Sequence, residues 1–309
     1  MQKVRRTAVE RIVVLAVLTV AVMVAVPLVA PVSAQLGGAG VGVDLSGEWA
    51  GIFHEEQPER GPGPELGDYL GLPINDAARL HGDTWSASRL TLPEEQCMPH
   101  PSTYALRGPM NLRIWKDVDP ITQTLVAIRT HGSWMAPERT FYMDGRPHPP
   151  AYAAHTWQGF TTGRYEGGIL TTLTTHLKEG WLRRNGIHHS DEATMVEHWI
   201  RHDTILTVVT IVTDPVYLTE PMMRTTNFRW APNQNVGAYP CSPFEVIVEI
   251  DRPAGIVPSH LPGTNEFVKE FSQTYKIPFE ATRGGAETIY PEYQVKLQQM
   301  MANEATQKK

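Results

Sequence analysis

The feature that most constrains the fold is a succession of short segments rich in β-branched and aromatic residues, separated by polar or Gly- and Pro-containing turns. These segments cover residues 45–53, 111–116, 124–129, 139–143, 168–177, 194–201, 205–213, 223–230 and 244–250. Few helical patterns lie between them, so most neighbouring strands are expected to be joined as hairpins. The pattern predicts a mainly β protein whose antiparallel sheet closes as a lipocalin-like, calycin-type barrel or packs as a sandwich.

Helical patterns lie outside this series. Asn75 is a good N-cap for a short helix that ends near Trp85. Near the C-terminus, apolar residues at helical spacing predict two short helices, one beginning near Thr264 and one after Pro291, with Met300 and Met301 in contact with the core. We therefore expect one barrel domain over residues 45–255, with a Pro- and Gly-rich loop at 54–74, and a helical C-terminal extension over 256–309.

The N-terminus predicts export. Residues 1–34 combine a basic start, an apolar run over residues 12–30 and small residues before Gln35, as in a cleaved signal peptide. The apolar run is also long enough to span a bilayer, so an uncleaved anchor is the alternative. Cleavage after Ala34 would leave a flexible leader over residues 35–44 and a periplasmic or secreted protein without a membrane anchor.

Two cysteines, Cys97 and Cys241, are the whole cysteine content of the chain. In an exported protein one disulfide between them is the only intramolecular pairing available. The alternatives are a free buried thiol or a metal ligand, since Cys97 and His100 have a short spacing that a metal site uses.

Charge and motifs exclude several classes of function. The formal net charge is −6, and no basic run interleaves with aromatic residues, so we expect no nucleic-acid partner. The chain contains no phosphate-binding Gly-rich loop, no Gly-x-Ser-x-Gly, no His-Glu-x-x-His and no Cys-x-x-Cys. The commonest nucleotide-binding, hydrolase and zinc-protease patterns are therefore absent.

Histidine is the residue type that most suggests metal binding or acid/base catalysis in this chain. Seven of the 12 histidines lie between residues 148 and 202. Imidazole binds transition metals and titrates near neutral pH. In residues 194–201, the alternation of a strand places Met195, Glu197, Trp199 and Arg201 on one face and His198 on the other. If the first face is inside, Glu197 and Arg201 are a candidate buried pair; if the second is inside, His198 and His176 are the candidate site.

Three sets of site residues follow, each weighed against a structural role. The candidate acid/base residues are Glu197, His189 and His176, and the candidate ligands of a divalent transition metal are His176 and His198. The candidate ligand-binding residues are Trp157, Tyr165, Trp199 and Arg201. His188 lies with His189 in a turn that is either a solvated loop or a His–carboxylate acid/base site, and Arg183 and Arg184 are candidate anion-binding residues.

Several motifs resemble a known group of proteins. They are the runs at residues 144–149, 157–160 and 163–168, the pair His189-Ser190, Glu197, Asp214-Pro215 and the run at 239–241. This pattern is similar to that of a large group of secreted bacterial proteins of unassigned function, over about residues 139–245. The chain departs from the group pattern at Tyr165, Gly168-Ile169 and His198-Trp199. The resemblance implies export and a lipocalin-like barrel, and it implies no reaction.

Two functions are therefore expected, with binding ahead of catalysis. The first is an exported barrel that holds a small apolar or aromatic ligand in its cavity, since such barrels enclose aromatic and aliphatic walls. The second is an exported enzyme, a hydrolase, isomerase or cyclase, that uses a His/Glu cluster with or without a metal. An envelope-assembly role is a third hypothesis, based on the Pro-rich loop and the acidic composition.

Overall fold

The computed structural model describes residues 42–54, 57–61, 63–242 and 255–307. The predicted signal segment, most of the leader and the strand expected over residues 244–250 lie outside the described residues. The described residues belong to one compact unit.

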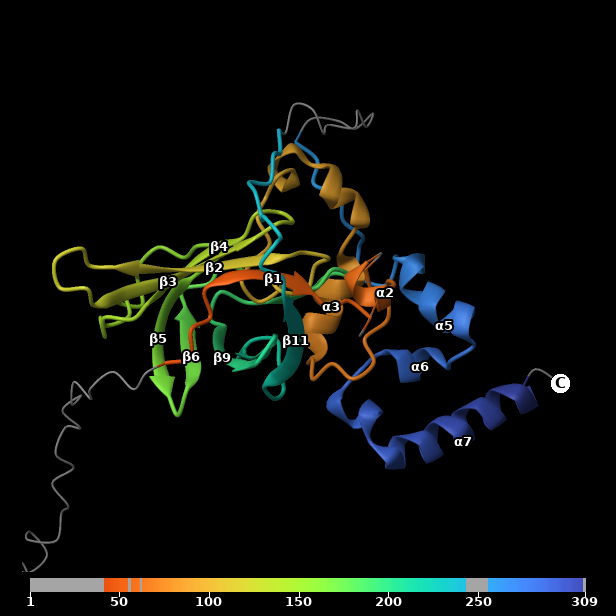
Figure 1. The fold of residues 1–309 in the computed structure, drawn as a ribbon. Helices are drawn as coiled ribbons and strands as arrows, with labels where there is room; N and C mark the ends of the chain where they lie inside the picture. Colours follow the sequence, from red (N-terminus) through yellow and green to blue (C-terminus); the bar gives the residue numbers. More distant parts are fainter. Residues whose placement is uncertain (1–41, 55–56, 62, 243–254, 308–309) are drawn as a thin grey trace, which may run out of the picture. The chain divides into compact units, whose positions relative to one another are not determined.

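The described chain is mainly β and forms a closed barrel (Figure 1). The nine barrel strands are β1 (Gly47–Gly51), β2 (Leu112–Val118), β3 (Leu125–Gly132), β4 (Glu138–Tyr142), β5 (Phe160–Glu166), β6 (Ile169–Thr175), β9 (Thr194–His202), β10 (Ile205–Thr213) and β11 (Met222–Trp230). Their order around the barrel is β1-β11-β10-β9-β6-β5-β4-β3-β2, with β2 pairing with β1 to close it. The predicted fold class is confirmed, with one difference: β4 and β5 pair in parallel.

The barrel interior is filled with side chains. Thirteen buried apolar residues form its core, among them Trp49, Phe141, Trp199 and Phe228. On β9 the inward face is that of Met195, Glu197 and Trp199, all at most 1% exposed. The predicted hairpin of β9 and β10 is confirmed, with His202 paired to Ile205 across its turn.

A second apolar cluster closes one end of the barrel. It joins the barrel-end residues Met195, Val212 and Met222 to the segment around Tyr69, to helix α3 (Asp76–Thr84) and to a separate hairpin. The strands of this hairpin are β7 (Gly180–Arg183) and β8 (Ile187–His189), which pair only with each other. As predicted, Asn75 caps α3, because its side chain accepts a hydrogen bond from the Ala78 amide.

The remaining helical elements are short, apart from the last. They are α2 (Gln57–Arg60), η1 (Ala87–Thr91), η2 (Pro93–Glu95), η3 (Glu266–Lys269), α5 (Glu270–Tyr275), α6 (Phe279–Thr282), η4 (Ala286–Ile289) and α7 (Pro291–Gln307). The C-terminal segment is tied to α3, since Arg283 pairs with Asp83 and the Asn265 amide donates to the Asp83 carbonyl. None of the helices described is long and apolar enough to cross a bilayer.

The expected core position of the C-terminal methionines is only partly correct. Tyr293 of α7 is buried, whereas Met301 is 46% exposed and Met300 is half-buried. The apolar stripe therefore anchors the helix at its start and leaves its later turns open to solvent.

Cys97 and Cys241 form a disulfide, with a Cα–Cα distance of 5.6 Å. The sequence left open a disulfide, a free buried thiol or a metal ligand, and the structure contains the disulfide. The bridge tethers the loop after η2 to the segment that follows β11.

Candidate functional site

The site is built where α3 meets the β7–β8 hairpin. Gly186, in the hairpin turn, has φ +92°, and a Cβ there would lie 2.7 Å from the Trp85 Cβ and 3.1 Å from the Gly82 Cα. Two glycines thus allow the helix and the turn to touch through their backbones. The contact brings His81 of α3 within 2.9 Å of the Gly186 carbonyl oxygen, through Nδ1.

Three side chains converge at this contact. Glu179 Oε1 lies 3.1 Å from His81 Nε2 and 3.5 Å from His188 Nδ1. One donor atom from each of His81, Glu179 and His188 lies within 4.8 Å of the other two. Glu179 and His188 belong to the β7–β8 hairpin and His81 to α3, so the contact of the hairpin with the helix completes the cluster.

The electrostatics of this cluster centre on Glu179. Hydrogen bonds to His188 and His81 hold the pKa of its carboxyl far below the usual range. The hydrogen bond to Glu179 raises the pKa of His81, whereas burial lowers the pKa of His188 to about 4. At neutral pH the cluster therefore contains an anionic carboxylate and a neutral His188 imidazole.

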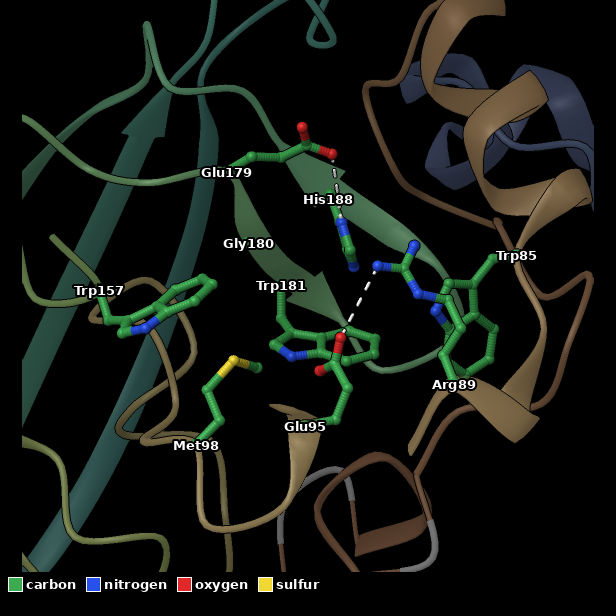
Figure 2. A pocket seen from close by; sticks show the side chains of 9 residues that line it. All are labelled: Trp85, Arg89, Glu95, Met98, Trp157, Glu179, Gly180, Trp181 and His188. Atoms are coloured by element: carbon green, nitrogen blue, oxygen red, sulfur yellow. Dashed lines mark ion pairs between the residues drawn. The ribbon is translucent and has the colours of Figure 1, made fainter. Parts of the chain in front are cut away.

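A pocket of about 300 Å³ opens beside the cluster. Its walls are Trp85, Arg89, Glu95, Met98, Trp157, Glu179, Gly180, Trp181 and His188 (Figure 2). Trp85 and Trp181 meet edge to face with ring centroids 5.5 Å apart. The volume is at the small end for ligand sites and corresponds to a molecule of one or two rings.

The polar groups of the pocket are few and mostly paired. Arg89 and Glu95 form an ion pair on one wall, with 3.7 Å between Nη2 and Oε1. His188 is the exception, since its Nε2 atom is buried and has no hydrogen-bond partner in the described structure. An unpartnered polar atom on the wall of a pocket is where a ligand hydrogen bond would be gained.

The three candidate acid/base residues are separated. Glu197 lies inside the barrel, where Arg139 donates two hydrogen bonds to its carboxylate at 2.9 and 2.6 Å. His189 is buried and its Nδ1 faces the Ser190 carbonyl, while His176 bonds the Pro150 carbonyl beyond the end of β6. Within the described chain, no hydrogen bond or ion pair joins any two of the three. The predicted Glu197–Arg201 pair is wrong: the partner of Glu197 is Arg139.

The four candidate ligand-binding residues are also dispersed, and only Trp157 lines the pocket. Trp199 belongs to the barrel core, and the Tyr165 hydroxyl donates to the Val43 carbonyl. Arg201 packs over the rings of Trp49 and Trp230, at 5.2 and 5.0 Å from their centroids.

His176 and His198 do not form a metal site in this structure. His198 faces outward from β9, and its Nδ1 bonds the Thr171 hydroxyl. His176 uses both ring nitrogens, Nδ1 toward Thr175 and Nε2 toward Pro150. A shared site for these histidines required the His198 face of β9 to point into the barrel. The face that points inward is that of Glu197.

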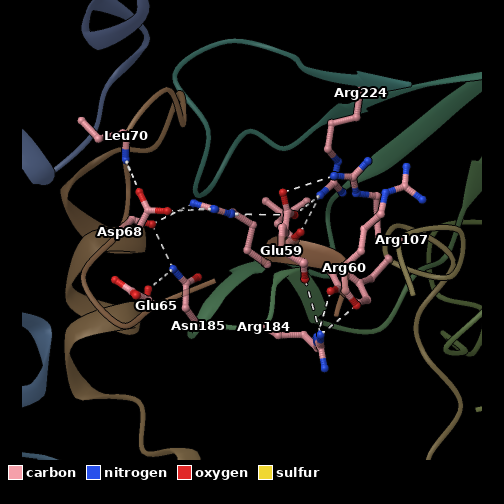
Figure 3. A network of polar contacts seen from close by, with 12 residues as sticks. Glu59, Arg60, Glu65, Asp68, Leu70, Arg107, Arg184, Asn185 and Arg224 are labelled. Atoms are coloured by element: carbon pink, nitrogen blue, oxygen red, sulfur yellow. Dashed lines mark hydrogen bonds and ion pairs between the residues drawn. The ribbon is translucent and has the colours of Figure 1, made fainter. Parts of the chain in front are cut away.

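The candidate anion-binding arginines are engaged by the protein (Figure 3). Arg184 donates to the carbonyls of Glu59, Arg60 and Gly61 at the end of α2, and Arg183 pairs with Asp68. Arg107 and Arg224 approach Glu59 from the other side. This network anchors α2 to the hairpin and to β11, which is a structural role.

Comparisons of the chain with protein-family models, curated proteins and solved structures found no match.

Sequence reasoning missed most of this site. His81, Glu179, Trp85, Trp181 and Met98 carry no motif, and for His188 the sequence leaves two interpretations open, a solvated turn and a His–carboxylate site. The signals that were present are weak: His81 lies on a correctly predicted helix, and the run from Gly180 to Leu182 is apolar. The contact of helix α3 with the β7–β8 hairpin becomes visible only in the structure, in the close packing at Gly82 and Gly186.

Proposed function

We propose that this protein is an exported β-barrel protein that binds a small planar aromatic molecule in the pocket beside the β7–β8 hairpin. The observation that carries the proposal is the buried, unpartnered Nε2 of His188 on the wall of a cavity lined by three tryptophans. Export is proposed from residues 1–34 and from the resemblance to a secreted group.

The pocket outside the barrel is preferred to the barrel interior. Because the interior is filled by large buried residues such as Trp49, Phe141 and Trp199, a ligand there would have to displace core side chains. The pocket needs no displacement, and its tryptophan rings favour stacking or edge contacts with a flat molecule. A hydrogen-bonding group on that molecule would meet His188 Nε2.

Titration with a panel of one- and two-ring aromatics, read by tryptophan fluorescence and thermal shift, tests the proposal, with fatty acids as the comparison for a barrel cavity. We expect saturable binding of aromatics that is lost in Trp157→Ala and retained in Trp115→Ala. Trp115 is the matched control because it is also half-buried but lies on β2, away from the pocket. No binding across the panel, or equal binding by the Trp157→Ala variant, would reject the proposed site.

Catalysis in the same pocket is the second candidate function. The observation in its favour is the Glu179–His188 pair, in which the carboxylate faces Nδ1 and leaves Nε2 toward the cavity, as in a general-base dyad. Turnover of aromatic esters that disappears in Glu179→Gln, with aromatic binding retained, is the result expected of an enzyme. Turnover that survives this substitution would exclude the dyad.

A further inference from the structure

We infer that His81, Glu179 and His188 bind a divalent transition-metal ion, with zinc as the first candidate. This extends the proposed function, because the ion would lie at the edge of the same pocket. Imidazole nitrogen and carboxylate oxygen are the donors that zinc takes in sites with two histidines and one acid. The donors come from α3 and the β7–β8 hairpin, which share one buried apolar cluster, so the site exists before any ion arrives.

The spacing of the donor atoms suits a small ion. Bonds of about 2.0–2.2 Å in a tetrahedral arrangement place neighbouring ligand atoms about 3.3 Å apart. The distances from Glu179 Oε1 to His81 Nε2 and to His188 Nδ1 are 3.1 and 3.5 Å. All three atoms lie within 4.8 Å of one another, so only side-chain adjustment is required.

The hydrogen bond on the far side of His81 prepares that residue for an ion. A carbonyl oxygen can only accept, so His81 Nδ1 carries the proton in its bond to Gly186. His81 also donates to the Glu179 carboxylate through Nε2, and an ion would replace the Nε2 proton and take up the lone pair of that atom. Such a second contact fixes the tautomer and orientation of metal-binding histidines in general.

His188 links the ion to the pocket. An ion on Nδ1 requires the ring proton on Nε2, the atom that is buried and without a partner beside the cavity. A bound molecule with an acceptor group would complete that bond. Three protein ligands also leave one tetrahedral position for water or for the bound molecule.

No other described group competes for the ion. Within the part of the chain that the structure describes, this is the single set of three His, Cys, Asp or Glu side chains whose donor atoms converge. The rings of His155 and His176 are 5.2 Å apart, yet His155 Nδ1 and both nitrogens of His176 already contact protein oxygens.

Metal content and titration of the untagged, purified protein test the inference. After chelation and desalting, Co²⁺ alone is added and its absorption in the visible region is followed, and Zn²⁺ is then used to displace it. We expect one ion per chain, and binding at least about tenfold weaker in Glu179→Gln and His81→Asn. His176→Asn is the matched control and should bind as the unmodified protein does, with near-ultraviolet circular dichroism confirming that each variant is folded.

The outcomes separate this inference from the proposed function. Failure to bind Co²⁺ or Zn²⁺, equal binding by Glu179→Gln, or loss in His176→Asn alone would overturn the metal site, while binding of aromatics would be unaffected. Conversely, Trp157→Ala should lose the aromatic molecule and keep the ion. Loss of the ion in this variant would contradict a site formed only by His81, Glu179 and His188.

Discussion

Glu197 is the most deeply buried charged residue of the barrel, and its role is structural. Its side chain is fully buried and is met by the guanidinium of Arg139 and the hydroxyl of Thr172. Replacing one member leaves an uncompensated buried charge, so Glu197→Ala is expected to lower the free energy of unfolding by about 3–5 kcal/mol. Urea unfolding followed by tryptophan fluorescence gives this value.

A double replacement distinguishes the cost of one unpaired buried charge from the net contribution of the ion pair. Arg139→Met with Glu197→Leu removes both charges and keeps the volume, so it should be close to the unmodified protein in stability. A single-variant cost below about 1 kcal/mol would show that the pair is hydrated in solution rather than enclosed.

His100 should make the protein sensitive to acid. Burial lowers its pKa to about 3, and its ring packs against Tyr104 and Trp134. In the unfolded chain His100 binds a proton near the ordinary pKa of 6.5, whereas in the folded chain it stays neutral down to about pH 3. The free energy of unfolding is therefore unaffected by this group above pH 6.5 and decreases as the pH falls from 6.5 toward 3. The prediction is that His100→Phe keeps the aromatic packing and flattens the decline of unfolding free energy over that range.

The matched control for this pH dependence is His202→Phe. His202 is exposed, with 90% of its side chain accessible, so its replacement should leave the pH profile unchanged. A His100→Phe profile as steep as that of the unmodified protein would contradict the assignment.

At the scale of elements, the turn of the β7–β8 hairpin determines the geometry of the site. Gly186 combines φ +92° with a close approach to Trp85 and Gly82, so an added methyl group is both strained and without space. We predict that Gly186→Ala lowers the free energy of unfolding by about 1–3 kcal/mol. It should also weaken Co²⁺ binding, because His81 Nδ1 is positioned by the Gly186 carbonyl.

Gly145→Ala separates the two causes. Gly145 has φ +75°, but a Cβ added at this residue would have no atom within 4 Å beyond its chain neighbours. This variant should show the cost of backbone strain alone, about 1 kcal/mol, with metal binding unchanged. Equal effects of the two substitutions on metal binding would mean that the contact of helix and hairpin does not position the cluster.

The elements themselves were largely predictable from the sequence, for a physical reason. Strands β9 and β10 are rich in β-branched and aromatic residues and flank a short polar turn, and the predicted boundaries differ from the observed ones by at most one residue. Strand β5 was missed because Gly163, Arg164 and Glu166 interrupt its apolar pattern. The hairpin of β7 and β8 was missed because strands of four and three residues are too short to show a period.

At the scale of the whole molecule, the site was not predictable, because it depends on which elements meet. His81 and Glu179 lie on a helix and a loop that no local pattern relates, and the pocket adds Met98 and Trp157 from two further segments. The histidine-rich stretch includes His188 of the site, but His176 and His198, the two histidines chosen from it as metal ligands, bond to other groups. The alternation of apolar and polar residues along one strand shows which face is buried. It does not show which residue of another element packs against that face.

The disulfide connects this tertiary assembly to overall stability. Cys97 adjoins Met98 of the pocket wall, and its bond to Cys241 closes a loop with a sequence separation of 144 residues. On the chain-entropy model, so long a loop contributes up to about 5 kcal/mol by restricting the unfolded chain. Cys97→Ala with Cys241→Ala should therefore lower the free energy of unfolding by a few kcal/mol, and the protein under reducing conditions should match this variant.

The measurement is urea unfolding with and without a thiol reductant. The double variant serves as its own control, since a reductant should not change its unfolding, whereas it should shift the midpoint of the unmodified protein. Because the bridge holds the wall that carries Met98, the variant should also bind the aromatic molecule more weakly while Co²⁺ binding is retained. An unfolding midpoint that does not move on reduction would show that folding of the barrel and of the pocket wall is independent of this bond.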